Sequence, residues 1–113
     1  MIHIQVFRDN LSQIQSVEVS GHAGYAEPGE DIVCAAVSAQ VISIENSLTR
    51  LLNLDMTTEV DEEAGGYLKL TLPKITSKQI THDAQLLLKH LEFALEVLSE
   101  NYPEYIQIQQ FNL

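Results

Sequence analysis

Five short segments in which apolar and polar residues alternate are the feature that most constrains the fold of this chain. They are residues 2–8, 14–20, 56–61, 67–72 and 104–111. A period of two is typical of β-strands that bury one face. Turn residues separate the first two segments and a glycine-containing loop separates the next two, so each pair predicts a hairpin. The alternation changes phase within 14–20, which predicts a β-bulge near Gln15 or Ser16.

Two longer segments, 31–54 and 76–102, carry apolar residues with helical spacing. The stripe of the first consists of Val37, Val41, Ile44, Leu48 and Leu51. The stripe of the second consists of Ile80, Ala84, Leu87, Leu91, Leu95 and Leu98. We therefore expect an α+β fold in ββαββαβ order, with a mostly antiparallel sheet packed against two helices. The pattern leaves open whether the last strand lies at an edge of the sheet or in an interface.

Length, charge and cysteine content narrow the function classes. A chain of 113 residues without a linker or repeat is expected to form a single domain, 1–113. Its formal net charge of −10 would repel phosphate backbones, so nucleic acid is not expected as a direct partner, whereas a basic peptide or protein would be attracted. The same charge is also what keeps many cytoplasmic proteins soluble. One cysteine cannot form an internal disulfide, which favours a reducing cytoplasm.

Neither a membrane anchor nor a bound metal is expected from the sequence. No apolar run approaches the roughly twenty residues of a membrane span. The N-terminus lacks the basic and apolar blocks of a signal peptide. Cysteine and histidine do not cluster with the spacing of a structural zinc site.

Residues 21–38, GHAGYAEPGEDIVCAAVS, hold three of the five glycines and the only cysteine. The stretch begins as a loop, because breakers occur at Gly21, Gly24, Pro28 and Gly29. It continues into the first expected helix, for which Asp31 is a candidate N-cap. The glycines would allow close approach of a substrate backbone and would let the loop open and close.

Cys34 and His22 in this stretch form a candidate nucleophile–base pair. Cys34 lies in the first turn of the expected helix, where unpaired N–H groups and the helix dipole lower the pKa of a thiol. The same N–H groups could hold an oxyanion. His22 lies at the mouth of the loop, which is long enough to bring its imidazole against the sulfur.

Simpler interpretations of the two residues stay open on spacing alone. A lone cysteine beside alanines at a helix start is often a small buried apolar residue. A histidine next to glycine is often only a turn residue. A metal site made of His22, Cys34 and an acid among Glu27, Glu30 and Asp31 is a weaker alternative, because the ligand spacing is not diagnostic.

The two runs 21–24, GHAG, and 29–38, GEDIVCAAVS, resemble the signature of the ribosomal-processing cysteine protease family, Prp. The chain is similar to that family in length, element order and acidity as well. The resemblance implies a cytoplasmic cysteine endopeptidase without a cofactor, whose catalytic dyad falls on His22 and Cys34. Its implied substrate is the precursor of the large-subunit ribosomal protein numbered twenty-seven, from which a short N-terminal extension is removed after an aromatic residue during ribosome maturation.

The resemblance also implies a homodimer and a loop that moves over the substrate. The loop candidates are Gly21, Ala23, Gly24, Tyr25 and Gly29. Asp31 and Ser38 are candidates for a supporting role. Asp31 would either orient His22 or cap the helix, and Ser38 lies one helical turn after Cys34 on the same face. The alternative from another class is a non-enzymatic module that binds a ribosomal protein or senses oxidants through a low-pKa Cys34.

Overall fold

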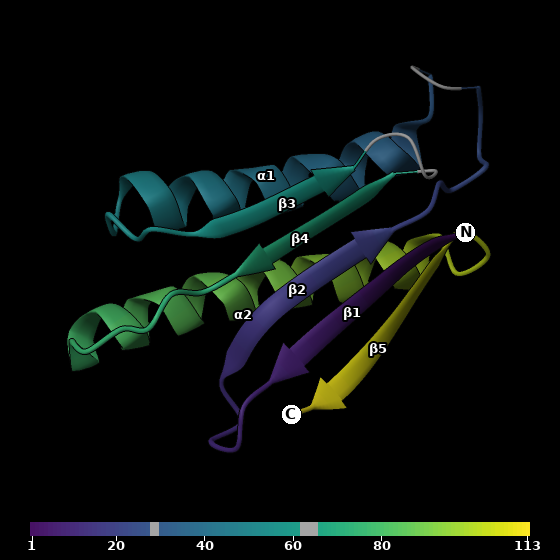
Figure 1. Cartoon of the computed structure of the whole chain (residues 1–113). Helices are drawn as coiled ribbons and strands as arrows, with labels where there is room; N and C mark the ends of the chain where they lie inside the picture. The colour runs from purple at the N-terminus through teal and green to yellow at the C-terminus, as the bar shows by residue number, and fades with distance from the viewer. Residues whose placement is uncertain (28–29, 62–65) are drawn as a thin grey trace.

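The computed structural model describes residues 1–27, 30–61 and 66–113, and its elements follow the expected order (Figure 1). They are β1 (Ile2–Arg8), β2 (Ile14–Ser20), α1 (Ile32–Arg50), β3 (Thr57–Asp61), β4 (Tyr67–Thr71), α2 (Lys78–Asn101) and β5 (Ile106–Asn112). The ββαββαβ order predicted from the alternation of strand and helix periods is therefore confirmed. The expected loop 62–66 lies outside the described residues except for Gly66.

The strands form one five-stranded sheet in the order β3-β4-β2-β1-β5. Three of the neighbouring pairs are antiparallel, and β5 alone pairs in parallel, with β1. The last strand thus occupies an edge of the sheet. The predicted β-bulge is also confirmed: Phe7 is opposite Ser16 and Arg8 is opposite Ile14, which leaves Gln15 without a partner in β1.

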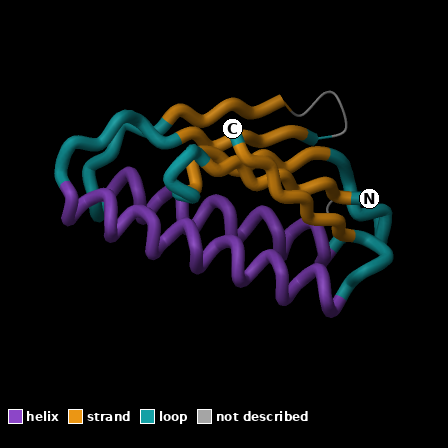
Figure 2. The backbone as a smooth tube through the Cα atoms, turned by 90° about the horizontal axis from the view of Figure 1, so that it is seen from below, coloured by secondary structure: helices purple, strands orange, loops and turns teal. Residues whose placement is uncertain are grey.

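Both helices cover the same face of the sheet, side by side (Figure 2). The apolar side chains of the strands point into this layer and pack against the stripes of the helices. Fully buried residues of the sheet include Ile2, Ile4, Val6, Val17 and Leu70, and those of the helices include Val37, Leu48, Leu88, Leu91 and Leu95. The α+β architecture predicted from the sequence is confirmed.

The first helix ends earlier than expected, at Arg50 rather than near residue 54. The backbone N–H of Leu51 donates to the Ser47 carbonyl as the helix cap, and Asn53 takes a left-handed φ of 54°, which turns the chain. Leu51 is 73% exposed and does not belong to the buried stripe. The prediction that included it in the stripe was wrong.

By length and composition, α1 could cross a membrane, with a mean hydropathy of 1.3. The sequence expectation that no segment is long and apolar enough was therefore too strict. Core helices of globular domains pass the same test, and one face of α1 is buried against the core at Val33, Val37, Val41, Ile44 and Leu48.

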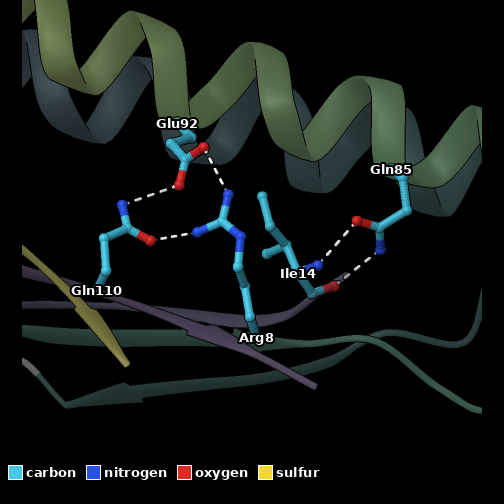
Figure 3. A network of polar contacts seen from close by, with 5 residues as sticks. All are labelled: Arg8, Ile14, Gln85, Glu92 and Gln110. Atoms are coloured by element: carbon cyan, nitrogen blue, oxygen red, sulfur yellow. Dashed lines mark hydrogen bonds and ion pairs between the residues drawn. The ribbon is translucent and has the colours of Figure 1, made fainter. Parts of the chain in front are cut away.

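Two polar contacts fasten α2 to the sheet (Figure 3). The side-chain amide of Gln85 accepts from the Ile14 N–H at 2.8 Å and donates to the Ile14 carbonyl at 2.9 Å. Further along, Glu92 binds the Arg8 guanidinium at 2.7 Å and the Gln110 amide at 2.9 Å, and Arg8 also donates to Gln110. The Gln85 contact supplies the backbone partners that the bulged end of β2 lacks.

Candidate active site

Asp31 starts α1 and places Cys34 in its first turn. The Asp31 Oδ1 accepts from the backbone N–H groups of Val33 and Cys34, each at 3.0 Å. This is the geometry of a helix N-cap, so the capping role considered for Asp31 is observed. No hydrogen bond joins Asp31 to His22, both of which the structure describes. The alternative in which Asp31 orients His22 therefore has no hydrogen bond to support it.

His22 is positioned by two glycines in left-handed conformations, Gly21 (φ +86°) and Gly66 (φ +90°). The Gly21 N–H donates to the Gly66 carbonyl at 2.9 Å, which joins the end of β2 to the start of β4. A Cβ at Gly66 would lie 3.4 Å from Cε1 of His22, so the imidazole lies directly beside this glycine. A Cβ at Gly21 would lie 2.5 Å from the Met1 carbonyl oxygen, a distance that no side chain tolerates.

His22 and Cys34 line the same cavity, which has a volume of about 440 Å³. The cavity lies between α1 and the β2, β3 and β4 part of the sheet, and most of its lining is apolar. Ser38 lines it as well, as expected from its place one turn after Cys34. Within the described part of the chain, no hydrogen bond joins the His22 imidazole to the Cys34 sulfur. The pair that the sequence singled out thus lines one cavity, and the structure shows no hydrogen bond between the two side chains.

Three sets of contacts hold the loop before α1: one to Cys34, one to Asp31 and one to a pair of tyrosines. The N–H of Ala23 donates to Sγ of Cys34 at 3.2 Å, and the Asp31 Oδ2 accepts from the N–H groups of Tyr25 at 3.1 Å and Ala26 at 3.5 Å. The Tyr25 ring packs edge-on against two tyrosines between α2 and β5, Tyr102 and Tyr105, at centroid distances of 6.1 and 5.3 Å. Of the predicted loop residues, Gly29 lies outside the described part.

The pKa of the Cys34 thiol is raised, so the prediction of a lowered pKa was wrong. Burial is the main cause, and the neighbouring Asp31 carboxylate raises the pKa further by its charge and by a hydrogen bond. The N–H of Ala23 acts in the opposite direction. The first-turn N–H groups that were expected to stabilise the thiolate are occupied by Asp31 instead.

The pKa of Asp31 itself is lowered. Desolvation alone would raise it, but the backbone N–H groups of Cys34, Tyr25 and Ala26 together favour the carboxylate. Asp31 is therefore charged at neutral pH and acts as the common acceptor for the helix start and the loop. Among the described residues, no three of histidine, cysteine, aspartate and glutamate gather in a way that could hold a metal ion.

Comparison with known proteins identifies the family. The sequence profile of the cysteine protease Prp family matches residues 1–107. The chain belongs to the cysteine protease Prp family. It is a cysteine protease accordingly, and the resemblance noted in the motif is confirmed.

Individual relatives of the Prp family agree over nearly the whole chain. The ribosomal processing cysteine protease Prp of Bacillus subtilis is 31% identical over 108 residues, which is 96% of either chain. The crystal structure of SMU.848 from Streptococcus mutans matches with a TM-score of 0.86 and 36% identity, over 100% of this chain and 96% of the other. The S. aureus Prp in complex with a covalently linked product peptide matches in fold, with a TM-score of 0.79, 24% identity and coverage of 97% and 99%.

Sequence reasoning missed two parts of the site. The position of the His22 ring depends on Gly66, which lies beside it. Gly66 is distant from His22 in the sequence, where it indicated only a hairpin turn. The docking of Tyr25 depends on Tyr102 and Tyr105, which lie more than seventy positions away. Neither contact leaves a pattern in a single sequence, because both arise from the packing of separate elements.

Proposed function

We propose that this protein is a ribosomal-processing endopeptidase that removes a short N-terminal extension from the large-subunit ribosomal protein numbered twenty-seven. The observation that carries the proposal is the common cavity of His22 and Cys34 in a chain of the Prp family. The relatives named as ribosomal processing proteases in B. subtilis and S. aureus support the substrate class. The protein acts in the cytoplasm as a homodimer and contributes in this way to ribosome maturation.

In the proposed reaction, His22 takes the proton of the Cys34 thiol, and the resulting thiolate attacks the scissile carbonyl and forms a carbon–sulfur bond. The electron pair of the carbonyl moves to oxygen, and backbone N–H groups near the sulfur stabilise the oxyanion. His22, as imidazolium, gives its proton to the leaving amine when the peptide bond breaks. His22 then takes a proton from water, which attacks the thioester and releases the acid product and the free thiol.

The geometry of His22 and Cys34 sets a requirement for this reaction. The raised pKa of Cys34 keeps the thiol protonated at rest, and His22 is not hydrogen-bonded to it. Substrate binding must therefore bring the imidazole to the sulfur. The N–H of Ala23, 3.2 Å from Sγ, is the donor that we propose for the oxyanion, because the first-turn N–H groups are held by Asp31. Ser38 and Asp31 act as supporting residues, and the substrate loop comprises Gly21, Ala23, Gly24, Tyr25 and Gly29.

The test is incubation with the precursor ribosomal protein and measurement of product masses. We expect the parent to release the extension, and Cys34→Ala and His22→Ala to leave the precursor intact. Cys34 lies among small residues, so Cys34→Ala should lower the free energy of unfolding by only about 1 kcal/mol and should still bind the precursor.

A binding module without catalysis is the alternative outcome. Such a module would leave the precursor uncut in the parent as well and would tolerate His22→Ala. Cleavage by the parent with unchanged cleavage by Cys34→Ala would instead mean that Cys34 is not the nucleophile.

A further inference from the structure

The cavity of His22 and Cys34 continues along one side of α1. The α1 residues that line it are Cys34, Val37, Ser38, Val41, Ile42 and Glu45. These residues follow one another at intervals that alternate between three positions and one, so they lie along a single stripe of the helix. The opposite wall is apolar at Val60, Leu68 and Leu70, and it also carries the side chains of Thr58, Asp61 and Tyr67. We call this continuous depression the α1 groove; in Figure 1 it corresponds to the side of α1 that faces β3 and β4.

Glu45 is the one charged side chain that α1 contributes to the groove. It is partly buried, and it accepts a hydrogen bond from the Thr49 hydroxyl at 3.1 Å. All six lysines and arginines belong to the described residues, and none of them forms an ion pair with Glu45. A partly desolvated carboxylate beside an apolar wall favours a cation from a ligand, because the lining supplies no counter-charge from lysine or arginine.

The distance along α1 from Cys34 to Glu45 predicts how many substrate residues separate the scissile bond from the residue that reaches Glu45. Eleven residues of α-helix span roughly 16 Å at 1.5 Å per residue. An extended peptide advances about 3.3 Å per residue, so five of its residues cover the same length. The flexible stem of lysine or arginine adds a reach of about one or two residues at either end.

We propose that Glu45 is a specificity residue that binds a lysine or arginine of the substrate about five residues from the scissile bond. This inference rests on the proposed function, which puts the scissile carbonyl at Cys34. The occupant of the α1 groove is an extended peptide with apolar residues near the cut and one basic residue at the Glu45 end. The net charge of −10 would steer such a peptide toward the protein in general, whereas Glu45 would fix its register.

The test uses synthetic peptides with an aromatic residue before the cut and a single lysine moved stepwise along either side. Binding of each peptide to the Cys34→Ala variant is measured by fluorescence anisotropy, and cleavage by the parent is measured as kcat/KM. We expect one lysine position, about five residues from the cut, to improve binding and kcat/KM by about threefold to tenfold over glutamine at that position. Glu45→Gln should remove this preference, and Glu45→Lys should transfer it to a glutamate peptide.

Glu59→Gln is the matched control, because it removes the same charge from a site outside the groove. Glu59 lies on β3 opposite Lys69, on the sheet face that the helices do not cover. An equal lysine preference in parent and Glu45→Gln, or an equal loss in Glu59→Gln, would overturn the proposal. If a Glu45-dependent lysine preference appears in binding but no peptide is cleaved, the proposed function fails; Glu45 then still binds a basic residue of a peptide, but the position counted from a scissile bond is refuted with the function. Unfolding curves of each variant show that the fold is retained.

Discussion

Replacing Asp31 by alanine removes four accepted hydrogen bonds that join the loop to the start of α1. Two come from Val33 and Cys34 at 3.0 Å, and two come from Tyr25 at 3.1 Å and Ala26 at 3.5 Å. Loss of an N-cap typically lowers stability by about 1 kcal/mol. The loop N–H groups are exposed and can bind water instead, so they add little. We expect Asp31→Ala to lower the free energy of unfolding by about 1–2 kcal/mol and Tm by roughly 4–8 °C.

Asp31→Asn separates capping from charge. Asparagine caps helices about as well as aspartate, so stability should change little. The carboxylate raises the pKa of the Cys34 thiol, so its removal should lower that pKa. A lower pKa means more thiolate at a given pH, and the thiolate is the species that reacts. The rate of alkylation by iodoacetamide, followed against pH, should therefore rise at lower pH in Asp31→Asn than in the parent.

Ser77→Ala is the matched control for these variants. Ser77 caps α2 and accepts one hydrogen bond, from the Ile80 N–H at 3.2 Å. The Ser77→Ala variant should lose about as much free energy of unfolding as Asp31→Ala. Its alkylation profile should stay that of the parent, because Ser77 is remote from Cys34. An Asp31→Asn profile equal to that of the parent, or shifted to higher pH, would refute the role of the carboxylate. An Asp31→Ala variant as stable as the parent would refute the role of the cap.

Two further substitutions test the supports of the site and of the sheet. Gly66→Ala forces alanine into a φ of +90° and brings its Cβ to 3.4 Å from the His22 ring. We therefore expect the free energy of unfolding to fall by about 1–2 kcal/mol and cleavage of the precursor to become slower. Full activity despite the lost stability would mean that His22 does not depend on this position. Gln85→Leu leaves the buried N–H and carbonyl of Ile14 unpaired, and urea unfolding should show a loss of about 2–4 kcal/mol, whereas the exposed Gln79→Leu should change little.

The arrangement of strands and helices could be predicted because each element carries its own period. Ile2, Ile4 and Val6 alternate along β1 and are buried as that alternation requires. Even the bulge at Gln15 is visible as a change of phase. The end of α1 was not predictable in the same way: Leu51 continues the spacing of the stripe, but the left-handed turn at Asn53 takes the chain away from the core.

The motif made it possible to predict that His22 and Cys34 lie close together, but the electrostatics around the thiol could not be predicted. Cys34 and His22 stand out in the sequence, and they line one cavity. The pKa of the thiol depends on burial and on which acceptor occupies the first-turn N–H groups, and both are properties of tertiary packing. Glu45 gave no signal, because a glutamate on a helix is ordinarily a solvated residue.

The raised thiol pKa bears on the choice between a protease and an oxidant sensor. Oxidant-sensing cysteines are exposed and of low pKa, since the thiolate is the form that oxidants attack. Cys34 is half-buried, and its pKa is raised because burial and the Asp31 carboxylate both oppose the thiolate. A protease tolerates this, provided that the bound substrate brings His22 to the sulfur and converts the pair to thiolate and imidazolium. Burial, and after it the carboxylate that starts α1, would then disfavour the thiolate until His22 reaches the sulfur.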